Sequence, residues 1–226
     1  MTSDALLTGA KAVVMGADKP VAAAIALALA EAGADVACTS TTGDPEEAFA
    51  LRPLRRKIEG LGRQAIADIA DLGNGSSVQI AVRQIAKQFG DLHLLILAPQ
   101  DVMAKPAERM SDAEWTRILG FNLDAYFFAA RAFAREVADN TTSPKGRIVA
   151  VLPAVEVTGG SAALEASRAG AAALTEALAR EWSPDVLVNA IALPAGGDEE
   201  WVTKWAVAEA LRFAMGGASG EVVAIS

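Results

Sequence analysis

Short apolar runs alternate along the chain with longer segments whose apolar residues recur at helical spacing. Residues 11–40 show this pattern most clearly, as an apolar run, a glycine-containing turn, an alanine-rich segment and a second apolar run. This order predicts a strand, a turn, a helix and a strand, which is the opening unit of a dinucleotide-binding sheet.

Similar units follow along the rest of the chain. A turn at 73–77 carries a serine cap, and Ser111 forms a capping box with Glu114. We expect a loop and helix at 44–62, and further helices at 78–89, 111–139, 161–182 and 201–215. Strands are expected at 64–68, 92–98, 146–152, 186–192 and 221–226. This alternation predicts the α/β class: a doubly wound, Rossmann-like parallel sheet of seven strands, with helices on both faces and a single domain over residues 1–226.

Composition narrows the possible partners. With 226 residues, 52% of them hydrophobic, the chain can bury a substantial core. A net charge of −8 and a pI near 4.8 leave no basic field for nucleic acid. We find no signal peptide and no apolar run long enough to span a membrane, so we expect a cytoplasmic protein without membrane contact.

Cysteine and histidine are each present once, as Cys38 and His93. Cys38 cannot form an internal disulfide, which fits a reducing cytoplasm, and we expect it to be a core residue of the second strand. Zinc sites need several clustered ligands, so we predict no metal site and a structural role for His93.

The first turn departs from the usual dinucleotide-binding pattern. Three spaced glycines normally allow a tight turn, a close approach to the pyrophosphate and close packing of helix on strand. Only Gly16 is in place, while Pro20 and Ala22 stand where the other two belong. Pro20 lacks an N–H and places its ring in the phosphate position, although proline also suits the first position of a helix. The pattern therefore predicts a retained fold and a lost binding surface.

Several segments resemble the short-chain dehydrogenase/reductase family, in family order and near family spacing. They are LAEAGADVA, the Asp68-Ile69 pair, FGDLHLLIL, EWTRILGFNL with Asn122, GRIV, SRAGAAALTEALARE and VLVNAIA. The resemblance runs from end to end and is closest in style to ketoacyl- and hydroxyacyl-type reductases. It implies descent from NAD(P)-dependent oxidoreductases.

The cofactor positions that the resemblance implies are altered. The family's Asn-Asn-Ala-Gly is replaced by LAPQ at 97–100, and the charged residue after strand two falls at Ser40 or Thr41, neither of which is charged. Asp68 is retained and would contact adenine in the family. It reads equally well as a solvated strand end or a cap of the following loop. We predict that no cofactor binds.

The catalytic positions are altered as well. In the family a tyrosine exchanges the hydroxyl proton, a lysine four residues later lowers its pKa, and an earlier serine holds the carbonyl oxygen. The resemblance places Leu164, Arg168 and Pro153 at these positions. Leucine has no proton to exchange, and proline offers no donor to an oxyanion. We predict no catalytic residue here, and expect the charge of Arg168 to serve an ion pair or a helix end.

The remaining candidates favour structural interpretations. Tyr126 is the only tyrosine, and Ala130 rather than lysine lies four residues beyond it, so it is interpreted as a core or subunit-contact aromatic. Asn122 is the remaining member of the family's catalytic four, and its side chain can hold water or backbone groups in the long helix. After Leu193 only PAGGDEE precedes the last helix, which leaves little material for the family's substrate lid.

Three functions remain open. The first is a catalytically inactive subunit that acts as a structural or regulatory partner of an active family member. The second is a cofactor-independent isomerase or lyase acting in the old cleft, and the third is a non-catalytic ligand sensor supported by Asp68.

The first function implies assembly. Family tetramers pair through the two long helices, here 111–139 and 161–182, and through the last helix and strand, so we expect an active homologue, a second copy, or both as partner. A related arrangement with one inactive subunit type occurs in the heterotetrameric hydroxyacyl-CoA-type alcohol dehydrogenase of anaerobic toluene degradation. More aromatic side chains follow the first long helix than one side of a monomer core needs, which predicts an aromatic patch buried against another subunit: Phe121, Tyr126, Phe127, Phe128 and Phe133.

Overall fold

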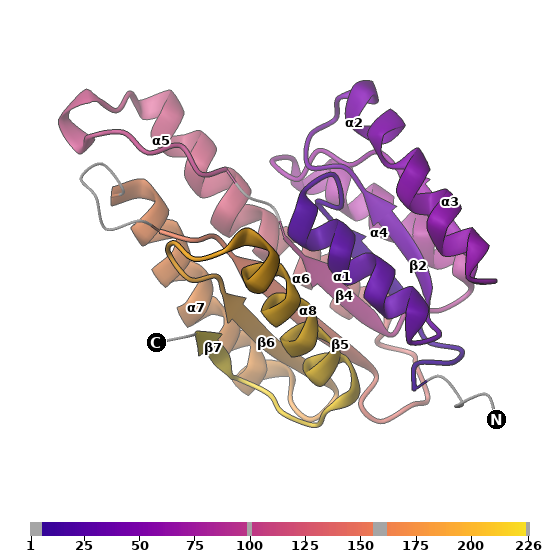
Figure 1. Cartoon of the computed structure of the whole chain (residues 1–226). Coiled ribbons are helices and arrows are strands. Elements are labelled where there is room, and N and C mark those ends of the chain that lie inside the picture. Colours follow the sequence, from indigo (N-terminus) through magenta and orange to yellow (C-terminus); the bar gives the residue numbers. More distant parts are fainter. Residues whose placement is uncertain (1–5, 99–100, 156–161, 225–226) are drawn as a thin grey trace.

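The computed structural model describes residues 6–98, 101–155 and 162–224. Within them, a seven-stranded sheet has the order β3-β2-β1-β4-β5-β6-β7, and every neighbouring pair is parallel (Figure 1). The strands are β1 (Lys11–Met15), β2 (Asp35–Thr39), β3 (Ala65–Asp68), β4 (Leu94–Leu97), β5 (Gly146–Leu152), β6 (Val186–Ala192) and β7 (Val222–Ala224). The predicted doubly wound parallel sheet is confirmed.

The helices form two layers. They are α1 (Pro20–Glu31), α2 (Pro45–Ala50), α3 (Arg52–Gly60), α4 (Gly75–Phe89), α5 (Asp112–Leu119), α6 (Ala125–Glu136), α7 (Ala162–Trp182) and α8 (Glu199–Met215). Helices α1, α3 and α8 pack on one face of the sheet, and α4, α6 and α7 pack on the other (Figure 1). Helix α5 extends away from the sheet at the upper left of the view.

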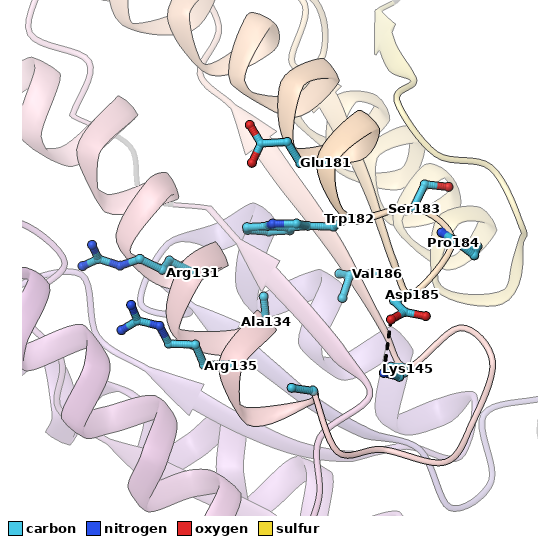
Figure 2. Close-up of a pocket in the computed structure, with 11 residues that line it drawn as sticks. Arg131, Ala134, Arg135, Lys145, Glu181, Trp182, Ser183, Pro184, Asp185 and Val186 are labelled. Atoms are coloured by element: carbon cyan, nitrogen blue, oxygen red, sulfur yellow. Dashed lines mark ion pairs between the residues drawn. The ribbon is translucent and has the colours of Figure 1, made fainter.

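A groove of about 550 Å³ opens where α6 and α7 end, near the amino ends of β5 and β6 (Figure 2). Arg131 and Arg135 come from α6, and Trp182 comes from the last turn of α7. Lys145 and Asp185 form an ion pair of 3.1 Å beside β5 and β6. The groove therefore lies at the opposite edge of the sheet from the carboxyl ends of the strands.

Several boundaries differ from the sequence-based expectation. The expected helix within 44–62 is two helices, because Pro53 has no N–H for a continuous helix and is tolerated only in the first turn of a new one. Helix α4 begins at Gly75 with Asn74 as its cap, rather than after a serine cap. The Asn74 side chain accepts hydrogen bonds from the N–H groups of Ser76 and Ser77, at 3.0 and 3.2 Å.

The helix expected at 111–139 is continuous but not uniform. Its capping box between Ser111 and Glu114 is confirmed. A π-helical turn, Gly120–Asp124, separates α5 from α6, which ends at Glu136. Such turns accommodate one extra residue, and here the turn carries Asn122. Ser161 and the last two residues of the expected final strand lie outside the described residues.

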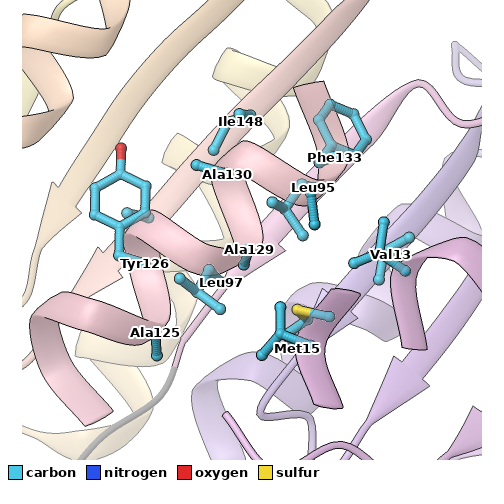
Figure 3. Packing of buried hydrophobic residues seen from close by; sticks show 14 of the residues in the cluster. Val13, Met15, Leu95, Leu97, Ala125, Tyr126, Ala129, Ala130, Phe133 and Ile148 are labelled. Carbon is cyan, nitrogen blue, oxygen red and sulfur yellow. The ribbon is translucent and has the colours of Figure 1, made fainter. Parts of the chain in front are cut away.

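Most of the expected aromatic patch is used by the chain's own core. Tyr126 and Phe133 are buried between α6 and the sheet (Figure 3). A Cβ on Gly146 would lie 2.8 Å from the Phe133 ring, so this packing requires glycine. The Phe128 ring lies against Gly75 of α4, and Phe121 also packs against the core. Phe127 alone of the five is exposed. The predicted patch was wrong, because packing within the chain already covers four of the five side chains.

The opposite layer holds the cysteine. Cys38 is fully buried on β2, as predicted, and burial raises the pKa of its thiol to about 12.

No helix in the described part of the chain is both long and apolar enough to cross a bilayer.

Candidate functional site

The carboxyl ends of the strands meet at one edge of the sheet, where open α/β folds place their ligands. Two cavities open there. One, of about 870 Å³, lies beyond β5 and β6, between α7 and the start of α8. The other, of about 470 Å³, lies beyond β2 near the start of α1 and is lined by residues including Lys19, Thr41 and Arg117.

The turn after β1 uses its one retained glycine for a tight bend. Gly16 has a φ of +81°, a conformation that favours glycine. The N–H of Ala17 donates to the carbonyl of Thr39 at 2.9 Å, and Pro20 begins α1. The helix-starting interpretation of Pro20 is therefore confirmed. Ala22 is fully buried, so its methyl group fills the space where glycine would allow closer packing.

A carboxylate occupies this turn, which the sequence interpretation missed. The Asp18 side chain is only 6% exposed. Its Oδ2 lies 2.8 Å from Lys19 Nζ, and its Oδ1 accepts a hydrogen bond of 2.7 Å from Thr41 Oγ1. The hydrogen bond to Asp18 raises the pKa of Lys19. A buried negative charge thus stands in the turn that cradles a diphosphate in dinucleotide-binding folds.

The ends of β2 and β3 are held by local hydrogen bonds. Ser40 Oγ donates to the carbonyl of Thr42 at 2.7 Å and accepts from the N–H of Ala70 at 3.2 Å. Asp68 Oδ1 accepts from the N–H of Ile69 at 2.8 Å, which agrees with its interpretation as a cap of the following loop. Pro99 and Gln100 of the altered fourth-strand motif lie outside the described residues.

Asn122 holds the segment that follows β4. Its Nδ2 donates to the carbonyl of Asp101 at 2.8 Å, and its Oδ1 accepts from the N–H of Asp101 at 3.1 Å. The Asp101 carboxylate in turn lies 2.6 Å from Arg117 Nε. The backbone-holding role predicted for Asn122 is confirmed, although the partner lies outside the helix.

Leu164 lies where the resemblance places the catalytic tyrosine. It is 3% exposed and packs with Ile118, Val155 and Ala163 in a small apolar cluster between α5 and α7. Met103, Met110 and Leu119 close this cluster from the side. We call these seven residues the Leu164 cluster.

Arg168 joins two strand ends. Its Nη1 donates to the carbonyls of Pro153 at 2.9 Å and Leu193 at 3.0 Å, directly after β5 and β6. The expectation of an ion pair or a helix end was wrong, because these bonds depend on chain segments that the local pattern does not bring together. Burial of the guanidinium lowers its pKa. The structure thus brings Pro153, Leu164 and Arg168 to one edge, with each in a packing or hydrogen-bonding role.

The remaining candidates lie inside the scaffold. The Tyr126 hydroxyl is 3.0 Å from Thr175 Oγ1, and burial raises the pKa of the phenol. His93 Nδ1 accepts from the N–H of Lys11 at 3.2 Å, a structural role as predicted. The described residues contain no group of three His, Cys, Asp or Glu side chains that could hold a metal.

Comparisons with known proteins agree with the fold. The profile of the short chain dehydrogenase family matches residues 10–197. The chain is 31% identical to D-threitol dehydrogenase of Mycolicibacterium smegmatis, covering 83% of this chain and 70% of that protein. It is 26% identical to 2-dehydro-3-deoxy-D-gluconate 5-dehydrogenase of Escherichia coli K12, covering 82% and 71%. The crystal structure of a short chain dehydrogenase from Mycobacterium smegmatis superposes with a TM-score of 0.87 at 24% identity, covering 100% and 95%.

Proposed function

Because the chain belongs to the short-chain dehydrogenase family, we propose that it is a non-catalytic member that serves as a structural or regulatory subunit beside an active dehydrogenase. Its named relatives are dehydrogenases, so the proposal rests on how this chain's own carboxyl edge is built.

The observation that carries the proposal is the Leu164 cluster. Hydride transfer to a carbonyl needs a group that supplies a proton near neutral pH. Leu164 supplies none, and its neighbours are apolar. Arg168, one turn further along α7, is occupied by two backbone carbonyls and cannot act as a free lysine would. Restoring one group would leave the others unsuited, since catalytic groups act as a unit.

The turn after β1 supports the same proposal. A nicotinamide dinucleotide brings two negative charges to this turn. Asp18 already places a buried carboxylate there, and Pro20 removes one of the N–H donors at the start of α1. Lys19 neutralises Asp18 at 2.8 Å, so its charge is not free for a phosphate.

Helix α7 offers the contact surface for the partner. Its exposed side carries small residues over three turns, namely Ala162, Ala166, Ala169 and Ala173, which let another helix approach closely. An antiparallel pairing centred between Ala172 and Ala173 would set Glu165 opposite the partner's Arg180, which is complementary in charge. Homologous chains of similar sequence could pair in the same register.

Cofactor binding tests the loss of catalysis. We expect calorimetry to give no dissociation constant in the low micromolar range for NAD(H) or NADP(H), and no turnover of alcohol–carbonyl pairs. Tight binding of either cofactor would refute the proposal.

Assembly is tested separately with two variants of exposed helix residues. Ala173→Arg places a long cation at the centre of the α7 face, and Ile80→Arg on α4 is the matched control, since Ile80 is 57% exposed. Light scattering and identification of copurifying proteins should show loss of the partner for Ala173→Arg alone. An unchanged assembly would show that α7 is not the contact surface.

A further inference from the structure

The larger cavity at the carboxyl edge has the lining of a binding site for an apolar carboxylate. It measures about 870 Å³, within the range of small-molecule pockets, and lies where α7 and α8 flank the ends of β5 and β6 (Figure 1). Leu152, Val155, Ala169 and Ala172 give it apolar walls. Arg168 is the only cation among its described lining residues.

Part of the Arg168 guanidinium is unused. A guanidinium carries five N–H donors, and the two bonds to Pro153 and Leu193 both start from Nη1. In the described part of the chain, Nε and Nη2 make no hydrogen bond and no carboxylate pairs with Arg168. A cation in a low-polarity environment is costly without a counter-charge, and the lowered pKa reports the same desolvation. Among the described residues, no anion therefore pairs with the Arg168 guanidinium.

A carboxylate suits the unused donors best. Its two oxygens match the planar fork of Nε and Nη2, and such charge-assisted pairs are short and directional. The two bonds from Nη1 hold the guanidinium in place before any ligand arrives, so little side-chain freedom would be lost on binding.

The body of the ligand should be apolar. Small side chains at Ala169 and Ala172 leave room along α7, and the indole of Trp201, 47% exposed, stands among the lining residues at the start of α8. Gly196 and Gly197 bring bare backbone to the cavity between β6 and α8. Glu165 also lines the cavity, and its negative charge opposes an anion. We propose that this cavity binds an amphipathic monocarboxylate, with its carboxylate on Arg168 and its apolar chain along α7.

This inference goes beyond the proposed function, because binding in the cavity does not depend on whether hydride transfer is lost. Its failure would leave the cofactor and assembly tests unaffected. Because Ala169 also lies on the proposed α7 contact face, octanoate binding is measured on the chain without a partner subunit.

Octanoate and 1-octanol are matched probes, since they share an apolar body and differ in charge. Calorimetry on the full chain should show saturable octanoate binding that is at least about tenfold tighter than that of 1-octanol. Arg168→Met keeps the length of the stem and should weaken octanoate at least about tenfold, while changing 1-octanol less than about twofold. Equal affinity for the two probes, or no octanoate binding at all, would overturn the proposal.

If Arg168→Met does not fold, variants at two exposed positions, Glu165 and Ala169, test the proposal instead. Glu165→Gln removes the opposing charge and should strengthen octanoate about two- to fivefold without affecting 1-octanol. Ala169→Phe fills the cavity from α7 and should abolish binding of both probes. If neither substitution changes octanoate binding, octanoate binds elsewhere and the proposed site is refuted.

Discussion

Helix α7 contributes to two regions that use buried side chains differently. Midway along the helix, Thr175 meets Tyr126 beneath α6, in a core made by facing helices and strands. Near its start, Leu164 and Arg168 face the carboxyl edge, where the family resemblance places chemistry. The core uses its buried side chains for packing, whereas at the edge Leu164 packs in an apolar cluster and Arg168 bonds two backbone carbonyls. One helix thus supports both a packed core and an edge in which a polar side chain joins two strand ends.

The largest effect is expected in the core. Phe133→Ala should lower the free energy of unfolding by about 3–5 kcal/mol, because Phe133 is fully buried and packs against Gly146. Phe127→Ala on the same helix is the control and should cost less than about 1 kcal/mol, since Phe127 is 38% exposed. Urea unfolding measures both. Similar losses would mean that the exposed face of α6 is also packed, by another subunit.

The edge should respond as a packed region too. Leu164→Tyr with Arg168→Lys restores two family residues, yet we expect no hydride transfer and a stability loss of about 1–3 kcal/mol. The tyrosine brings a hydroxyl into the Leu164 cluster, and lysine cannot reproduce the bonds to Pro153 and Leu193. Reduced-nicotinamide absorbance and urea unfolding are the two measurements. Robust turnover by the double variant would show that the carboxyl edge of the sheet can act as a catalytic site.

The pH dependence of stability that comes from the buried Cys38 thiol is a test of packing on the other face of the sheet. The unfolded Cys38 ionises near its ordinary pKa of 9.0, while burial holds the folded thiol neutral to about 12. Its contribution is therefore fully present below pH 9 and is lost as pH rises towards 12, at up to about 1.4 kcal/mol per pH unit. Cys38→Ala should flatten the fall in stability between pH 9 and 10. Equal slopes for both proteins would show that the thiol is solvated.

The sequence predicts elements that follow from local pattern, but not contacts that depend on tertiary structure. Strands β5 and β6 were predicted to the residue, because each is an apolar run bounded by polar or turn residues. The partners of Arg168 lie 15 and 25 residues away, and no periodicity encodes them. The burial of Asp18 was not predicted either, since it involves a contact with Thr41, in the segment after β2. Pro53, in the first turn of α3, is the local signal in the sequence for the break between α2 and α3.

The smallest effect is expected at the start of α5, which carries one wall of the Leu164 cluster. Hydrogen bonds from Lys105 and then from Ser111 lower the pKa of Glu114 from 4.5 to about 2. Glu114 thus stabilises the helix start above pH 4.5, and this contribution is lost as pH falls through 2. The bonds to Lys105 Nζ, 2.7 Å to both carboxylate oxygens, are accessible to solvent and so weakened by salt.

Glu114→Gln should therefore fray the first turn of α5 without unfolding the chain. We expect amide exchange at Glu114 and Trp115 to accelerate severalfold near neutral pH, with little change at pH 2, where the wild-type carboxylate is itself being protonated. Glu108→Gln, at an exposed position before the helix, is the control and should leave both amides unchanged. If exchange at Leu164 accelerates together with that of α5, the edge and the helix open as one unit, and the edge is less firmly packed than the core. If it does not, the Leu164 cluster is held by α7 and the sheet alone.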